Sequence, residues 1–188
     1  MTKRENKIIV NNHENLHDYG LDSKSRTINL IGDIDEEQYH NFSCNITALE
    51  NENTTPIKVF LKTGGGEIDS GVAIIERIKL SPCEVHIYAQ GYVASIGIFI
   101  LASGDKRIGT SLTLYMHHES SYEIDNNHKN NKAYVKQQEI EDIKLSKWLS
   151  KQTKKDFKFW KELGVSIDYY FDSEQAFEYG LIDEIIEI

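Results

Sequence analysis

Residues 85–102 read VHIYAQGYVASIGIFILA, and this stretch decides the fold of the chain. Residues 85–89 have the pattern of a buried strand, and the apolar run that follows suits a buried helix but is too short to span a bilayer. Ser95 lies between them, at a predicted strand-to-helix turn. A helix start offers unpaired N–H groups and the positive end of the dipole, which stabilise an anion or an oxyanion. Ser95 is therefore either an ordinary N-cap or a reactive hydroxyl.

The alternation of apolar strand and helical pattern recurs along the chain. Repeated strand–helix units predict parallel strands joined by crossover helices, and thus an α/β fold. The polar residues 1–25 are predicted to form an N-terminal arm, which leaves residues 26–188 as a single domain. The other elements are predicted at residues 28–31 (strand), 36–49 (helix), 57–61 (strand), 72–80 (helix) and 112–116 (strand).

Composition excludes several classes of protein. The 188 residues carry a formal net charge of −9, which argues against a nucleic-acid-binding surface. The two cysteines, Cys44 and Cys83, do not make a disulfide framework. The N-terminus lacks the apolar core of a secretory signal, and no stretch is long enough to span a membrane. We therefore expect a soluble cytoplasmic protein.

The segment around Ser95 belongs to a set of five motifs. It is not the G-x-S-x-G elbow of lipase-like hydrolases, because Val93 stands where that motif has its serine. In order, the set is RTINLIGDID (26–35), TGGG (63–66, with Gly71 beyond it), GYVASIGIFILA (91–102), LYMH (114–117) and SEQAFEYGLID (173–183). Together these motifs resemble the proteolytic subunit of the Clp protease, over residues 26 to the C-terminus.

The resemblance implies a crotonase-like α/β fold of repeated β–α units and a Ser-His-Asp peptidase working in a ring-shaped homo-oligomer, with the rings stacked. By its position relative to Ser95, His117 is the expected general base. His118 should point to the opposite face of the strand. Counting back from the closing motif gives Asp168 as the orienting carboxylate. The competitor, Asp172, reads better as the N-cap of the last helix.

The glycines of residues 63–66 are expected to let the backbone approach a substrate. By analogy with the family, the N–H groups of Gly66 and Ile96 would bind the oxyanion. A phosphate-binding loop is the rival interpretation, but no Gly-Lys-Ser/Thr follows. No cofactor is expected. The implied partners are polypeptide substrates, other copies of the chain and an ATP-dependent AAA+ unfoldase.

Residues 119–163 are expected to form a protruding handle, with a long helix over 132–163. Its apolar side chains, among them Leu145, Trp148 and Leu149, exceed what a domain of this size is expected to bury. The helix is therefore predicted to dock on a partner subunit, as the handle does in the resembled family.

One motif points to a different chemistry. His13, Glu14 and His17 match H-E-x-x-H, the zinc-peptidase signature. A zinc site needs a stable helix with a buried face, and the surrounding residues are polar and offer no third ligand. We interpret this as a chance match and predict no metal site.

The chain also departs from the resembled family. Gly64 replaces a proline beside the expected oxyanion hole, and the segment after His117 lacks the family's glycine-rich strand. These changes leave open an alternative function, a non-catalytic or regulatory ring subunit of a Clp-like assembly. An acyl-CoA-handling crotonase relative is disfavoured, because it would not need the Ser/His/Asp set.

Overall fold

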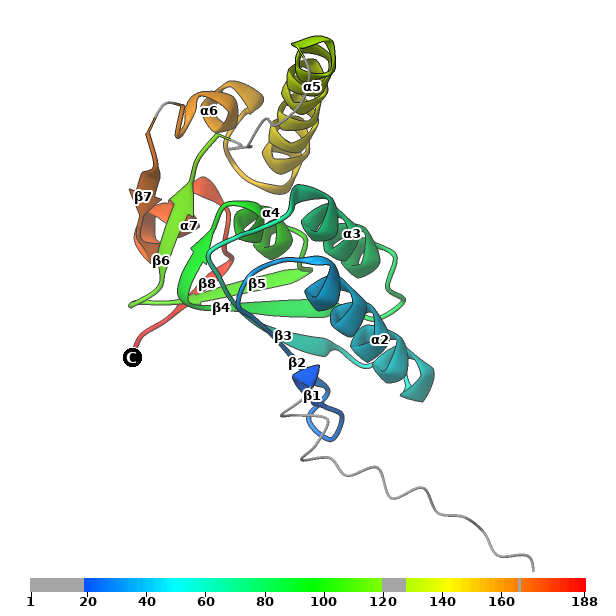
Figure 1. Cartoon of the computed structure of the whole chain (residues 1–188). Coiled ribbons are helices and arrows are strands. Elements are labelled where there is room, and N and C mark those ends of the chain that lie inside the picture. Colours follow the sequence, from blue (N-terminus) through cyan, green and yellow to red (C-terminus); the bar gives the residue numbers. More distant parts are fainter. Residues whose placement is uncertain (1–18, 120–127, 166) are drawn as a thin grey trace, which may run out of the picture.

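The computed structural model describes residues 19–119, 128–165 and 167–188. Its strands are β1 (Leu21–Asp22), β2 (Thr27–Ile31), β3 (Ile57–Thr63), β4 (Val85–Ala94), β5 (Lys106–Thr110), β6 (Leu114–His117), β7 (Tyr169–Phe171) and β8 (Glu184–Ile186). Its helices are α2 (Glu36–Glu52), α3 (Ile68–Lys79), α4 (Ile96–Ala102), α5 (His128–Gln152), α6 (Phe157–Glu162) and α7 (Ser173–Tyr179) (Figure 1). The predicted α/β class is confirmed.

The strands form one sheet that divides along β4. The neighbours run in the order β1-β2-β3-β4-β5-β8, and β6 pairs with both β4 and β7. The first half of β4 pairs with β5 and its last residues, Tyr92 to Ala94, pair with β6. All pairings are parallel except β1–β2 and β6–β7. The division separates a β5–β8 branch from a β6–β7 branch, and the C-terminal end of β4 lies on the second.

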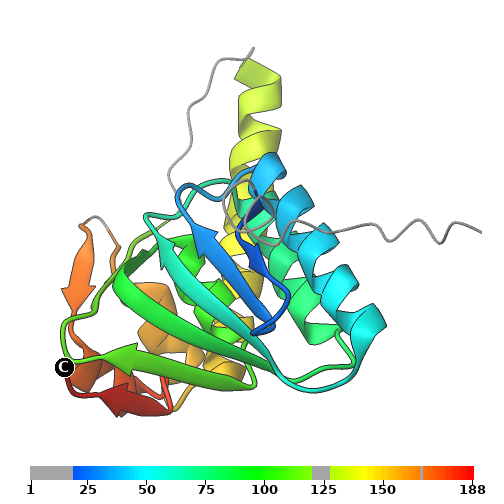
Figure 2. The same ribbon diagram turned by 90° about the horizontal axis from the view of Figure 1, so that it is seen from below.

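Helices cover one face of the sheet. In β3 every second residue is buried, beginning with Ile57, while Lys58 and Lys62 are exposed. This period of two turns one row of side chains to the core and the other outward. The views of Figures 1 and 2 show α2, α3 and α4 on the same side of the strands, so the buried row packs beneath these helices. On the outward face, Phe60 and Tyr88 pack with ring centroids 5.2 Å apart.

The predicted helix over residues 132–163 is two helices with a turn between them. Asp156 ends the turn, because its carboxylate accepts a 2.8 Å hydrogen bond from the backbone N–H of Phe159 and caps α6. The indole N–H of Trp160 then donates to Thr153 Oγ1 at 2.7 Å. This contact folds α6 back toward the end of α5, and Trp160 is buried.

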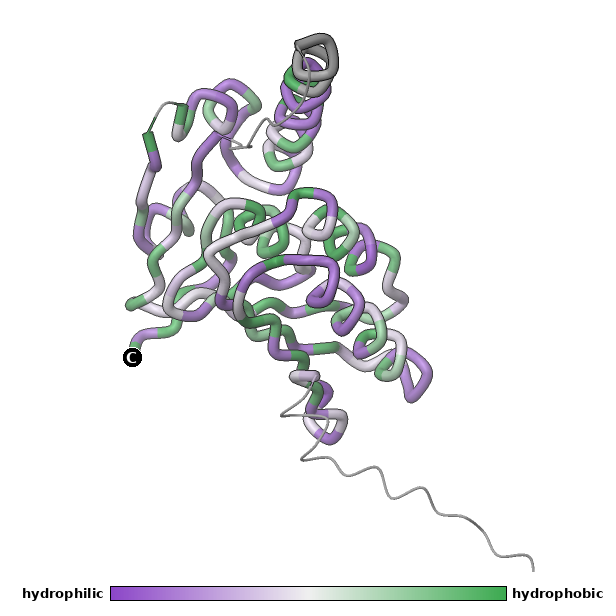
Figure 3. Tube along the Cα trace, in the orientation of Figure 1, coloured by the Kyte–Doolittle hydropathy of each residue, from purple (hydrophilic) through white to green (hydrophobic). Residues whose placement is uncertain are grey.

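The expectation that the domain cannot bury the apolar side chains of the handle is wrong for its C-terminal half. Leu149 is fully buried, and Leu145 and Trp148 pack against the same core cluster. Ile140, further out on α5, is exposed. Figure 3 shows α5 standing away from the sheet, and the residues of its coloured part are largely hydrophilic. The helix is thus anchored at its base and projects beyond it.

The start of the described chain packs on the domain. Leu21 of β1 belongs to the hydrophobic core, and the side-chain amide of Asn45 on α2 donates to the Tyr19 carbonyl at 2.6 Å. The end of the segment predicted as an arm therefore contributes a strand to the sheet.

Candidate active site

Ser95 connects β4 to α4 in a strained backbone conformation. Its φ and ψ are 56° and −128°, in a region that residues with a side chain rarely occupy. Its N–H donates to the Met116 carbonyl at 3.0 Å, which ties the turn to β6. The hydroxyl makes no capping bond to α4, so Ser95 is not an ordinary N-cap serine. The hydroxyl instead lies within hydrogen-bond distance of a histidine side chain.

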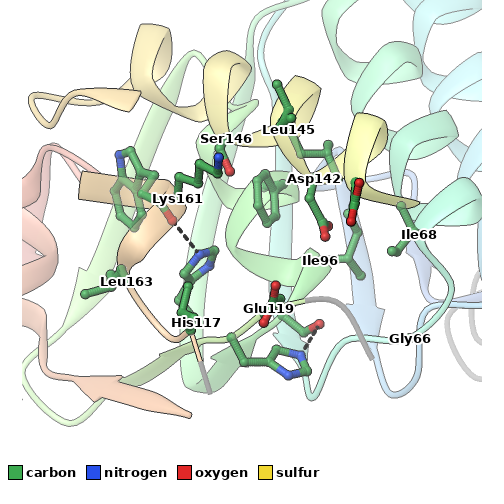
Figure 4. A pocket seen from close by; sticks show the side chains of 17 residues that line it. Gly66, Ile68, Ile96, His117, Glu119, Asp142, Leu145, Ser146, Lys161 and Leu163 are labelled. Carbon is green, nitrogen blue, oxygen red and sulfur yellow. Dashed lines mark hydrogen bonds between the residues drawn. The ribbon is translucent and has the colours of Figure 1, made fainter. Parts of the chain in front are cut away.

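His118 is the histidine that contacts Ser95. Its Nε2 lies 2.8 Å from Ser95 Oγ, within hydrogen-bond distance. His118 follows the end of β6, and β6 lies beside the end of β4, so the sheet brings the two residues together. Both residues line the cavity described below, whose wall is drawn in Figure 4.

The prediction that His117 faces the serine is wrong. His117 points into the core, where its exposed fraction is 6% and its ring lies edge-on against Trp160. Its Nε2 lies 3.2 Å from the Trp160 carbonyl, and because a carbonyl only accepts, this nitrogen carries the hydrogen. Burial lowers the pKa of His117 to about 4 and keeps the ring neutral. Successive strand residues do face opposite ways, as expected, but the assignment of faces is reversed.

Asp168 lies across from His118. The antiparallel register of β6 and β7 pairs His117 with Tyr169, so the next position outward pairs His118 with Asp168. The carboxylate lies 3.8 Å from His118 Nδ1, which is an electrostatic contact longer than a hydrogen bond. The Tyr170 hydroxyl is 3.5 Å from the same carboxylate. Tyr92, near the C-terminal end of β4, also interacts with this aspartate. Burial and the neighbouring Tyr170 and Asp168 raise the pKa of the Tyr92 hydroxyl.

Asp172 serves as a helix cap. Its side chain accepts from the backbone N–H of Gln175 at 2.9 Å, and the Gln175 side chain returns to the Asp172 N–H. This capping box begins α7. The structure thus brings Asp168, and not Asp172, to the histidine.

The glycine loop packs directly against Ser95. A side chain at Gly65 would put its Cβ 2.5 Å from Ser95 Cβ, and Gly65 has φ +105°. The next residue, Gly66, lines the same cavity as Ser95 and Ile96. Among the described residues, the N–H groups of Gly66 and Ile96 meet no hydrogen-bond acceptor. Two free amides beside a hydroxyl are the requirement for an oxyanion hole.

The cavity beside Ser95 has a volume of about 450 Å³. It lies between α4, α5 and α6, and apolar side chains such as Ile96 and Phe99 form part of its wall (Figure 4). A cavity of this size holds a side chain or a short peptide segment. The hydroxyl, the imidazole and the two amides all lie at its edge.

Neither a metal site nor a membrane span is found in the described part of the chain. Residues 19–119, 128–165 and 167–188 contain no group of His, Cys, Asp and Glu that could hold an ion. The His13, Glu14 and His17 match lies outside the described residues. No described helix combines the length and the apolar character that a bilayer requires.

Comparison with known proteins identifies relatives over nearly the whole chain. The ATP-dependent Clp protease proteolytic subunit 2 of Corynebacterium efficiens is 28% identical over 168 residues, or 88% of this chain and 84% of the relative. The subunit 2 of Treponema denticola is 27% identical over 187 residues, or 98% of this chain and 92% of the relative.

A solved structure has the same fold. A point mutant of ClpP1 from Listeria monocytogenes superposes with a TM-score of 0.81 at 24% sequence identity, covering 88% of this chain and 94% of that chain. The sequence model of the Clp protease family matches residues 11–188. The predicted resemblance is confirmed, and the chain belongs to the Clp protease family.

Proposed function

We propose that the chain is a serine endopeptidase that cleaves unfolded polypeptides or peptides inside a ring-shaped homo-oligomer. The observation that carries this proposal is the 2.8 Å contact between Ser95 Oγ and His118 Nε2 at the edge of a cavity. Membership of the Clp protease family supports the same activity. His118 takes the role that the sequence had assigned to His117.

The reaction follows from the positions of these groups. His118 would accept the Ser95 proton while Oγ attacks a peptide carbonyl carbon, and the N–H groups of Gly66 and Ile96 would stabilise the oxygen that becomes negative. The C–N bond then breaks as His118 returns the proton to the leaving amine. Water, deprotonated by His118, releases the acyl group from Ser95. Asp168 would orient the imidazole and stabilise its charged form.

Covalent labelling tests the proposal. A phosphonate that reacts with activated serines should modify Ser95, as peptide mapping would show, and Ser95→Ala should abolish labelling and cleavage of fluorogenic peptides. The expected loss in rate is on the order of 10⁴-fold or more. Hydrolysis should be insensitive to EDTA. Cleavage that disappears with EDTA and returns with zinc would contradict the serine mechanism.

A non-catalytic ring subunit is the second candidate. The observation that favours it is the long contact between His118 and Asp168, whose side chain is half exposed. An assembled particle in which Ser95 resists labelling would support this candidate. An AAA+ unfoldase as partner and a cytoplasmic location remain predictions from the resemblance and the composition.

A further inference from the structure

The walls of the cavity beside Ser95 combine apolar and acidic side chains. Its apolar lining comes from α4, with Ile96 and Phe99, and from α5, with Ile143 and Leu145. Glu139 and Asp142 also line it from α5, three residues apart and therefore on one face of the helix. Figure 4 shows Asp142 pointing from α5 toward Ile96.

The described residues of this cavity wall carry more negative than positive charge. Glu119, which follows His118, adds a third carboxylate, and Lys161 of α6 contributes an ammonium group. His118 also lines the cavity, next to Ser95. Among the lining residues that the structure describes, three carboxylates against one lysine give an excess of negative charge where a substrate side chain would enter.

A buried acceptor without a partner lies in the same wall. His117 borders the cavity, and its Nδ1 is buried with no hydrogen-bond partner among the described residues. Because Nε2 carries the hydrogen that faces the Trp160 carbonyl, Nδ1 presents a lone pair. A buried acceptor of this kind favours a ligand that donates hydrogen bonds.

We propose that this cavity selects a lysine or arginine side chain from the residue on the acyl side of the bond that Ser95 attacks. The inference rests on the proposed peptidase function. The side chain of that residue lies nearest the attacked carbonyl, and so next to the cavity that Ser95 borders. An ester with Ser95 would hold it there until water releases it.

Lysine and arginine match both parts of the wall. Their methylene stems pack on apolar surface while the cationic head reaches polar groups. Here the stem would lie along Ile96 and Phe99, and the head would meet Glu139 and Asp142. An uncharged apolar side chain of the same length would displace water from the two carboxylates without offering them a positive charge. The carboxylates would then lose hydration without compensation, and this desolvation would weaken binding. An acidic side chain would in addition meet like charge.

Matched peptides provide the test. Fluorogenic peptides that differ only in having lysine or its uncharged analogue norleucine before the scissile bond should differ in kcat/KM by at least about tenfold, in favour of lysine. Glu139→Gln combined with Asp142→Asn should reduce that ratio toward one. Glu141→Gln removes one of the negative charges of α5 at a position outside this cavity, so it should leave the ratio unchanged. An equal or higher rate with norleucine in the unmodified protein would overturn the inference.

A binding measurement tests the selectivity of the cavity independently of the proposed peptidase function. Fluorescence polarisation with Ser95→Ala should show tighter binding of a labelled peptide ending in lysine than of one ending in norleucine, and the double variant should remove the difference. Preferential binding of lysine without any cleavage by the unmodified protein would refute the peptidase function and retain the selectivity. Cleavage with equal binding of both peptides would refute the selectivity alone.

Discussion

His117 and His118 are adjacent in sequence but have opposite environments. His118 contacts Ser95, whereas His117 contacts Trp160 and the core. We expect His118→Ala to lose on the order of 10⁴-fold in kcat/KM, because Ser95 would lack a base. His117→Gln should instead lower the midpoint of urea unfolding while its folded fraction still reacts with the serine phosphonate. Loss of labelling in a folded His117→Gln, with labelling retained in His118→Ala, would contradict the assignment.

The buried His117 also predicts how stability depends on pH. Its pKa is about 4 in the folded protein and 6.5 ordinarily, so below pH 6.5 the unfolded chain binds a proton that the folded chain does not. Its contribution to stability is complete above pH 6.5 and is lost as the pH falls toward 4. By pH 5 the loss is about 2 kcal/mol. Urea unfolding at pH 7.5 and pH 5 should give a larger difference for the unmodified protein than for His117→Gln. Equal differences would exclude a low pKa for His117.

Gly65 offers a test of the backbone around Ser95. An alanine there would place its Cβ 2.5 Å from that of Ser95, in a backbone conformation that disfavours a side chain. The loop or the serine must then move, so Gly65→Ala should lower kcat more than tenfold while circular dichroism stays native. Gly64→Ala is the matched control, because no atom lies within 4 Å of the position of its Cβ. Equal effects of the two changes would show that the close approach is unimportant.

The sequence predicted that Ser95 lies at a strand-to-helix turn and favoured Asp168 over Asp172 as the neighbour of the histidine, but it placed His117 beside Ser95, where the structure has His118. Ser95 could be found because a buried strand and a buried helix meet there. Alternation shows only that His117 and His118 face opposite ways. Which of them meets Ser95 depends on the pairing of β4 with β6, a contact between distant segments. The available signal was that His118 directly precedes a polar segment, where the strand leaves the core.

The register of β6 and β7 gives Asp168 and Asp172 different environments. It places Asp168 beside His118 and leaves Asp172 to cap α7. Asp168→Asn should therefore reduce kcat by about 10²- to 10⁴-fold, since the imidazole loses its orienting charge. Asp172→Ala should cost about 1 kcal/mol of stability through the lost cap and retain the activity of the folded protein. Urea unfolding and steady-state kinetics on both variants check this, and the reverse pattern would show that the register is wrong.

At the scale of elements, local sequence patterns predicted the bounds of helices and strands best where the packing is regular. The helix predicted over residues 36–49 is α2, and the strand predicted over 57–61 is β3. The predicted helix over 72–80 ends at Lys79, and Leu80 is exposed at the C-cap instead of packing. The break between α5 and α6 depends on the Asp156 cap and the Trp160 contact with Thr153. Continuous helical periodicity in the sequence did not reveal that break.

Assembly is a property of the whole molecule, and α5 is the element that projects from it (Figure 1). The base of α5 is fixed by Leu149 in the core of its own chain, and it lines the cavity beside Ser95. Contacts made further out on α5 would therefore bear on the geometry of the site. Trp148 is a poor probe of such contacts, because it packs on its own core and a charge there would also destabilise the fold.

Ile140 is the better probe, since it is 39% exposed and lies further out on α5. If copies of the chain associate through this helix, Ile140→Glu places a charge in an apolar contact and should dissociate the assembly into smaller species. Sedimentation velocity should show that shift, together with a lower rate of peptide cleavage. Leu80→Glu is the control, because Leu80 is an apolar residue that is 79% exposed at the C-cap of α3 and does not belong to α5. An unmodified protein that sediments as a monomer and still cleaves peptides would refute both assembly through α5 and its coupling to Ser95.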